Sequence, residues 1–194
     1  MGLLGPGPAE AHIQHARGFA RAFREITGSA SDPTRALDLG AGGGLPGLVL
    51  LFEWPTTTFV WLDSSERSTE FLASAAARLG ETARVEVVRG RAEEVGRQPA
   101  LRHQLDLVVA RSFGRPAVTA ECAAPFLAAG GHVVVSEPPR ELVDRWDATG
   151  LALLGLEKSG HWRDEAGYQV LRQVWACPER FARRSGRPQK HPLF

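Results

Sequence analysis

The stretch that decides the fold is Asp38-Leu39-Gly40-Ala41-Gly42-Gly43-Gly44-Leu45-Pro46-Gly47. It continues a short apolar run at residues 36–39, which is typical of a buried strand. Pro46 suits the first turn of a helix that runs to about Phe52. Glycines between a strand and a helix leave the backbone bare, so that a ligand can approach it. The stretch therefore predicts a strand, a ligand-binding loop and a helix in succession.

Strand-like and helix-like segments alternate along the rest of the chain. We expect helices at residues 9–26, 66–79 and 116–128, the last bent at Pro125, and strands at 57–62, 84–88, 105–110, 132–136, 151–157 and 168–176. This alternation is typical of βαβ units with right-handed crossovers. It predicts an α/β fold with a doubly wound, mainly parallel Rossmann-like sheet, and ligands then bind beyond the carboxyl ends of the strands.

Composition excludes several classes of protein. The chain has 194 residues, of which 43% are apolar and 23% charged, and these values indicate an ordinary globular domain. The longest uncharged stretch, residues 39–52, is broken by glycines and is too short to span a membrane. No secretory signal precedes it, and two cysteines offer neither a disulfide framework nor zinc spacing. We expect a cytoplasmic protein with no membrane partner and no metal.

Two cofactors suit the glycine loop. A dinucleotide would use a Gly-x-Gly-x-x-Gly pattern, which Gly42, Gly44 and Gly47 fit, although Pro46 falls inside it. S-adenosylmethionine is favoured by an acid before the loop, Asp38, followed by Gly40 and Gly42, because that cofactor is cationic and carries no phosphate. The second strand ends at Asp63, followed by Ser64, and a carboxylate there can accept both ribose hydroxyls of either cofactor.

Two further strand ends complete the expected site. After the third strand, Ala92 and Glu93 are candidates to bind the adenine through backbone and carboxylate. After the fourth strand comes Arg111, followed by Ser112 and Phe113, where a transferred methyl group would point. A guanidinium does not titrate usefully, so Arg111 is expected to orient the reactants rather than to move a proton.

The charge of the chain is unevenly distributed. The net charge is +1, yet the segment from residue 180 to the end holds four arginines, one lysine and no acid. Such a tail often contacts nucleic acid phosphates, and its alternative interpretation is a solvated terminus. The candidates for substrate contact in it are Arg183, Arg184, Arg187 and Lys190.

Several segments resemble one known family. They are residues 38–48, Leu62-Asp63-Ser64-Ser65-Glu66-Arg67, residues 89–94, Val109-Ala110-Arg111-Ser112-Phe113, and the tail Arg183-Arg184-Ser185-Gly186-Arg187-Pro188-Gln189-Lys190-His191-Pro192-Leu193. Together they resemble the bacterial 16S rRNA guanine-N7 methyltransferases, also called the glucose-inhibited division protein B family. The resemblance covers nearly the whole chain, and its most specific parts are the Gly-Leu-Pro-Gly loop and the tail.

The resemblance implies a seven-stranded class I S-adenosylmethionine-dependent methyltransferase sheet that ends in an antiparallel hairpin. It implies cofactor contacts at Gly40, Leu45, Ala92, Glu93 and Arg111, with Asp63 on the ribose. The implied acceptor is N7 of a guanine in 16S ribosomal RNA, which has no proton to lose, so no general base is expected. The implied organisation is a helical lead-in at residues 1–35, a methyltransferase domain at 36–178 and a basic tail at 179–194.

The chain departs from the family pattern at two points. It starts at a segment that further helices normally precede, and it has Ser136-Glu137-Pro138-Pro139 where the family carries a lysine-glycine pair. Glu137 places an anion beside the expected acceptor pocket and could bind a ring N–H or an amine. This favours an alternative function, methylation of a small nitrogen heterocycle or another metabolite. A third hypothesis is a dinucleotide binder or a cofactor-binding scaffold without methyl transfer.

Overall fold

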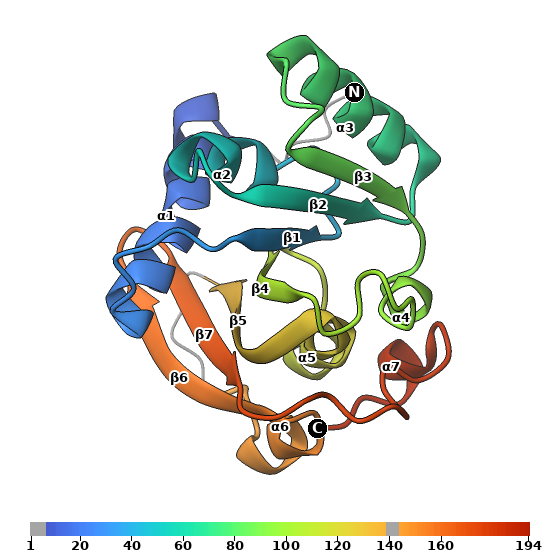
Figure 1. The fold of residues 1–194 in the computed structure, drawn as a ribbon. Coiled ribbons are helices and arrows are strands. Elements are labelled where there is room, and N and C mark those ends of the chain that lie inside the picture. The colour runs from blue at the N-terminus through green and yellow to red at the C-terminus, as the bar shows by residue number, and fades with distance from the viewer. Residues whose placement is uncertain (1–6, 139–143) are drawn as a thin grey trace.

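The computed structural model describes residues 7–138 and 144–194, and it contains one seven-stranded sheet (Figure 1). The strands are β1 (Arg35–Leu39), β2 (Thr58–Asp63), β3 (Val85–Arg89), β4 (Leu105–Ala110), β5 (Leu127–Glu137), β6 (Leu156–Arg163) and β7 (Gly167–Gln173). Their order is β3-β2-β1-β4-β5-β7-β6, and only β7 runs antiparallel to its neighbours. The prediction of a doubly wound, mainly parallel sheet is confirmed.

Helices cover both faces of the sheet. They are α1 (Ala9–Thr27), α2 (Gly47–Glu53), α3 (Glu66–Leu79), α4 (Ala92–Val95), α5 (Pro116–Ala123), α6 (Ala148–Leu153) and α7 (Arg187–Lys190), with a 3-10 turn at Ala124–Phe126. The first three lie over one face and the others gather at the opposite face (Figure 1). The connecting helices therefore move from one face of the sheet to the other after β3. The helix expected at residues 66–79 is confirmed over its whole length.

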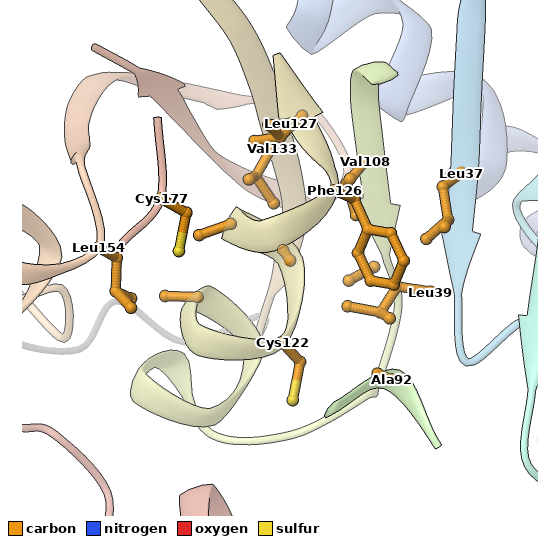
Figure 2. Packing of buried hydrophobic residues seen from close by; sticks show 14 of the residues in the cluster. Leu37, Leu39, Ala92, Val108, Cys122, Phe126, Leu127, Val133, Leu154 and Cys177 are labelled. Atoms are coloured by element: carbon orange, nitrogen blue, oxygen red, sulfur yellow. The ribbon is translucent and has the colours of Figure 1, made fainter. Parts of the chain in front are cut away.

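Alternation along the strands builds two cores. Leu37 and Leu39 of β1 point to the face covered by α5, whereas Ala36 points to the face covered by α1. The first core continues through Val108, Phe126 and Leu127 to the cysteines Cys122 and Cys177 (Figure 2). Both cysteines are buried and unpaired, as expected for small apolar residues.

Several boundary predictions are wrong, since β5 begins at Leu127 rather than at residue 132 and β7 ends at Gln173 rather than at residue 176. The helix expected to run to residue 128 ends at Ala123, and the glycine pair 130–131 lies inside β5, where the pairing with β4 shifts register. A Cβ at Gly131 would meet three carbonyl oxygens at 3.0–3.1 Å, so the glycine allows a bulge rather than stopping a helix.

The strand expected at 151–157 begins only at Leu156. The residues before it form α6, whose N-cap Asp147 accepts a hydrogen bond from the Gly150 N–H at 2.6 Å. Two short helices, α4 and α7, were not predicted.

Helix α1 is fastened to the hairpin strand β7. Tyr168 of β7 is 1% exposed, and its hydroxyl donates to the His15 carbonyl at 2.6 Å. Its ring lies against α1 at Gly18, where a Cβ would be 2.1 Å from the tyrosine oxygen. The absence of a side chain at Gly18 therefore permits the close approach of helix and sheet.

We predict that Gly18→Ala destabilises the protein although alanine is the better helix former. The gain in helix propensity is about 1 kcal/mol, whereas overpacking against a buried ring costs about 1–3 kcal/mol. Urea unfolding should give a lower free energy of unfolding for this variant. Ile13→Ala, on the exposed side of the same helix, should change it by less than about 0.5 kcal/mol. A Gly18→Ala protein as stable as the wild type would show that Tyr168 moves freely.

Candidate functional site

A cavity opens at the edge of the sheet where β1 to β4 end. Its volume is about 400 Å³, within the usual range for small-molecule sites. Every lining residue but one comes from the segments that end or follow these four strands, including α4 and α5. The lining is Leu39, Gly40, Leu62, Asp63, Ser64, Gly90, Arg91, Ala92, Glu93, Ser112, Phe113, Val118, Cys122 and Gln189. This is the edge at which doubly wound sheets bind ligands.

The glycine loop is held by backbone and carboxylate contacts. The N–H groups of Gly40 and Ala41 donate to the Leu62 carbonyl at 2.9 and 3.0 Å. Gly42 N–H donates to Asp63 Oδ2 at 2.8 Å, and Gly47 N–H donates to Asp38 Oδ2 at 2.7 Å. Gly40 and Gly42 have φ values of +72° and +50°, which side chains rarely adopt. The loop thus presents bare backbone beside β2.

Asp38 supports this loop through its hydrogen bond from Gly47 and does not line the cavity. It is 1% exposed, and a Cβ on Gly47 would lie 2.7 Å from its Oδ2. Burial raises the pKa of Asp38 to about 7, with a smaller contribution from the Asp63 charge, while the Gly47 hydrogen bond and Arg111 lower it. The carboxyl therefore titrates near neutral pH, and a nearby cation would favour its charged form.

Asp63 faces the cavity, and Ser64 lies next to it. Asp63 is half-buried; besides Gly42, it accepts a hydrogen bond from the Ser65 N–H on Oδ1 at 2.8 Å. A carboxylate held from two sides on a cavity wall can accept the two hydroxyls of a ribose. This carboxylate acceptor and the bare glycine backbone suit a nucleoside cofactor without phosphate.

Ala92 and Glu93 line the same cavity at the start of α4. The Glu93 carboxylate is 5% exposed and already engaged, because Oε1 accepts the Gly186 N–H at 2.8 Å and lies 3.5 Å from the Arg91 guanidinium. Glu93 therefore meets a ligand mainly through its backbone.

Arg111 lies at the end of β4, with Ser112 and Phe113 in the cavity wall beside it. Its Nη2 is 2.9 Å from His12 Nδ1 of α1, a contact that the sequence did not predict. Burial, helped by the Arg111 and His12 charges, lowers the pKa of His15 to about 4, so His15 is neutral at pH 7. Helix α1 thus holds the Arg111 guanidinium through His12.

The structure brings together Gly40, Asp63, Ser64, Ala92 and Glu93 among the expected cofactor residues. Four others border the loop or β4 without lining the cavity, namely Asp38, Gly42, Leu45 and Arg111. The sequence did not single out Val118, Cys122 or Gln189, because they reach the cavity from α5 and α7 and follow no strand end.

The expected substrate residues separate into two groups. Glu137 accepts hydrogen bonds from Arg145 at 2.8 Å and from Trp146 Nε1 at 2.7 Å, so its charge is neutralised within the chain. Arg183 pairs with the fully buried Glu121. Arg184, Arg187 and Lys190 are exposed, and no ion pair is found for them among residues 7–138 and 144–194.

Within the part of the chain that the structure describes, no cluster of three metal-ligating side chains occurs. Nor does any helix there have the length and apolar character needed to cross a membrane.

We predict that the free energy of unfolding reveals the titration of Asp38. The folded protein keeps a proton on this carboxyl up to about pH 7, whereas the unfolded chain releases it near its ordinary pKa of 3.8. This group therefore stabilises the protein less as the pH rises through that window. Asp38→Asn should gain stability relative to the wild type as the pH rises from about 4 to about 7, measured by urea unfolding. A difference independent of pH would contradict the raised pKa.

Comparisons with known proteins agree with this geometry. A sequence model of the family described as rRNA small subunit methyltransferase G (GidB) matches residues 13–141. The ribosomal RNA small subunit methyltransferase G of Prochlorococcus marinus (strain MIT 9313) is 36% identical over 173 residues, which cover 85% of this chain and 70% of that protein. That of Pelotomaculum thermopropionicum is 34% identical over 170 residues, covering 84% and 71%.

Solved structures show the fold. A SAM-dependent methyltransferase from Aquifex aeolicus superposes with a TM-score of 0.64 at 13% identity, covering 87% of this chain and 94% of that one. The [4+2]-cyclase SpnF gives 0.61 at 21% identity, covering 81% and 63%. Since a cyclase shares the fold, the fold alone does not assign the reaction. The family match does assign the enzyme class: this chain is an S-adenosylmethionine-dependent methyltransferase and belongs to the rRNA small subunit methyltransferase G family.

Proposed function

We propose that this protein transfers a methyl group from S-adenosylmethionine to N7 of a guanine in 16S ribosomal RNA. The observation that carries the proposal is the cavity at the β1–β4 edge, with Asp63 and the bare Gly40 backbone in its wall, in a chain of this family. The relatives at 34–36% identity are named for methylation of small-subunit ribosomal RNA.

The cofactor supplies an already activated methyl group on a sulfonium. The chain's task is then to hold donor and acceptor in line, with the reacting atoms about 3–3.5 Å apart. Asp63 binds the ribose, and the backbone of Gly40 admits the methionine part. Guanine N7 offers a lone pair and no proton, so the site needs no general base.

Arg111 orients the reactants in this proposal. Its guanidinium stays charged at any working pH, and His12 holds it from α1 at 2.9 Å. Burial lowers the pKa of Arg111 from its ordinary value, with Tyr168 and Asp38 opposing that change, which agrees with a position between the helix and the loop. A fixed cation beside the methyl-transfer region can bind the electron-rich edge of the acceptor base.

The exposed tail cations supply the RNA contact. Arg184, Arg187 and Lys190 are exposed in the segment that also contributes Gln189 to the cavity lining. The small-metabolite alternative loses its support, because the Glu137 carboxylate is already bound by Arg145 and Trp146. A ribosomal substrate also implies work in the cytoplasm, where small subunits are assembled.

We predict that the triple variant Arg184→Ala/Arg187→Ala/Lys190→Ala binds ribosomal RNA more weakly and with less dependence on salt. Each lost phosphate contact lowers the slope of log K against log salt by about 0.7–0.9. Filter binding at several salt concentrations measures that slope. Transfer of label from S-adenosylmethionine to small subunits, followed by nucleoside analysis for 7-methylguanosine, measures the activity.

Arg78→Ala is the matched control, since Arg78 is an exposed cation on the last turn of α3. It should leave binding and activity unchanged. Label that enters free metabolites but not small-subunit RNA would overturn the proposed acceptor while leaving the enzyme class intact.

A further inference from the structure

Residues 177–194, here named the C-terminal strap, are bound to the domain along their whole length. Arg102, 8% exposed, donates to the carbonyls of Cys177, Pro178 and Phe181 at 3.0, 3.2 and 2.9 Å. Arg97 donates to the Ala182 carbonyl. At the far end, Leu193 and Phe194 pack against the buried core, and the Phe194 ring lies against Gly150 of α6. The strap is therefore part of the folded domain and not a solvated arm.

One buried ion pair fixes the middle of the strap. Glu121 of α5 is 0% exposed and accepts three hydrogen bonds from Arg183, from its backbone N–H at 2.9 Å, Nε at 2.7 Å and Nη2 at 2.5 Å. Arg183 Nη2 also donates to the His191 carbonyl at 2.8 Å. A buried carboxylate is costly without its partner, so only one placement of the strap satisfies Glu121. Arg183 is thus committed to the fold.

The next residues bring the strap to the cavity. Ser185 Oγ donates to Glu94 at 2.6 Å, and Gly186 N–H donates to Glu93 at 2.8 Å. The short helix α7 follows directly, beside α5 (Figure 1). Its Gln189 joins Ala92, Glu93 and Cys122 in the cavity wall.

We infer that the strap forms a wall of the cofactor pocket and that the Gln189 carboxamide binds the polar edge of the adenine. The inference rests on the proposed use of S-adenosylmethionine. With the ribose at Asp63, the base extends toward α4 and α5, where Ala92, Val118 and Cys122 offer mostly apolar contacts.

Gln189 adds to this end of the pocket, beside the backbone of Ala92 and Glu93, a side chain that can both donate and accept hydrogen bonds. Adenine presents an amino donor beside ring-nitrogen acceptors, and a carboxamide carries both an acceptor and donors. The Glu93 carboxylate already accepts the Gly186 N–H and pairs with Arg91. The hydroxyl groups in the lining belong to Ser64 and Ser112, which follow β2 and β4 and not α4 or α5. Gln189 is therefore a specificity residue, and Arg183 and Glu121 are positioning residues that hold its helix.

Calorimetric titration with S-adenosylhomocysteine and with its purine-riboside analogue, which carries a hydrogen in place of the amino group and so loses one hydrogen bond to a carboxamide in either orientation, tests the inference. The wild type should prefer the adenosine compound by about tenfold, the value of one good hydrogen bond. Gln189→Ala should weaken binding of that compound and bring the ratio of the two dissociation constants close to one. Arg78→Ala, which changes an exposed cation on α3 outside the cavity lining, should keep the wild-type ratio.

The positioning pair is tested with Glu121→Gln/Arg183→Leu, which removes both charges at once. This double variant should bring the ratio of the two dissociation constants close to one, as Gln189→Ala does. The single variant Arg183→Lys, which keeps the positive charge, should retain part of the wild-type preference. A merely structural pair would lower the melting temperature and leave the ratio unchanged.

An unchanged ratio in Gln189→Ala, or a wild type that binds both compounds equally, would overturn the inference and leave the proposed function standing. A wild type that binds neither compound would overturn both.

Discussion

Two carboxylates at neighbouring strand ends hold the glycine loop, and the site depends on them. Asp38 accepts the Gly47 N–H and Asp63 accepts the Gly42 N–H, so the loop is fixed at both ends by side chains of β1 and β2. The glycines supply the left-handed backbone that this path requires. The buried carboxyl supports the loop, and the half-buried one both supports it and faces the ligand. The same loop thus combines rigidity with an open surface.

The rest of the domain surrounds this loop with walls from distant parts of the chain. Helix α1 fixes Arg111 through His12 on one side, and the C-terminal strap brings Gln189 to the other. The basic tail is consequently divided in its roles. Arg183 neutralises Glu121 inside the protein, while Arg184, Arg187 and Lys190 remain exposed. Cofactor pocket and RNA-contacting surface, as proposed, are adjacent because one short segment contributes to both.

The sheet could be predicted because its signals are local. A strand end followed by glycines, β-branched runs and the Ser65 cap of α3 are each contained in a few residues, and Ser65 does accept the Ser68 N–H. One error occurs where distant contacts decide, because the bulge at Gly131 depends on carbonyls of β4. Another has a local cause that the strand prediction overlooked: Asp147 caps α6 through the Gly150 N–H, three residues on.

The residues of the site likewise divide into those that local sequence signals predict and those that distant contacts place. Asp63, Ser64, Ala92 and Glu93 follow strands, so topology alone predicts their common edge. The hydrogen bonds from Gly186 to Glu93 and from Arg183 to Glu121 join residues whose numbers differ by 93 and 62. No local pattern carries that information, and charge alone indicates only an exposed tail.

The most direct test of the account is calorimetric titration of S-adenosylhomocysteine into the wild type and Asp63→Asn. Asparagine can still accept the Gly42 N–H through its one oxygen, with loss of the acceptor for the Ser65 N–H, so the loop should persist while the charged acceptor for the ribose is lost. The account predicts one site in the wild type and affinity about 10–100-fold weaker in the variant, at similar melting temperature. Glu70→Gln, exposed on α3, should bind as the wild type does. Equal affinity in Asp63→Asn, or no binding by the wild type, would contradict it.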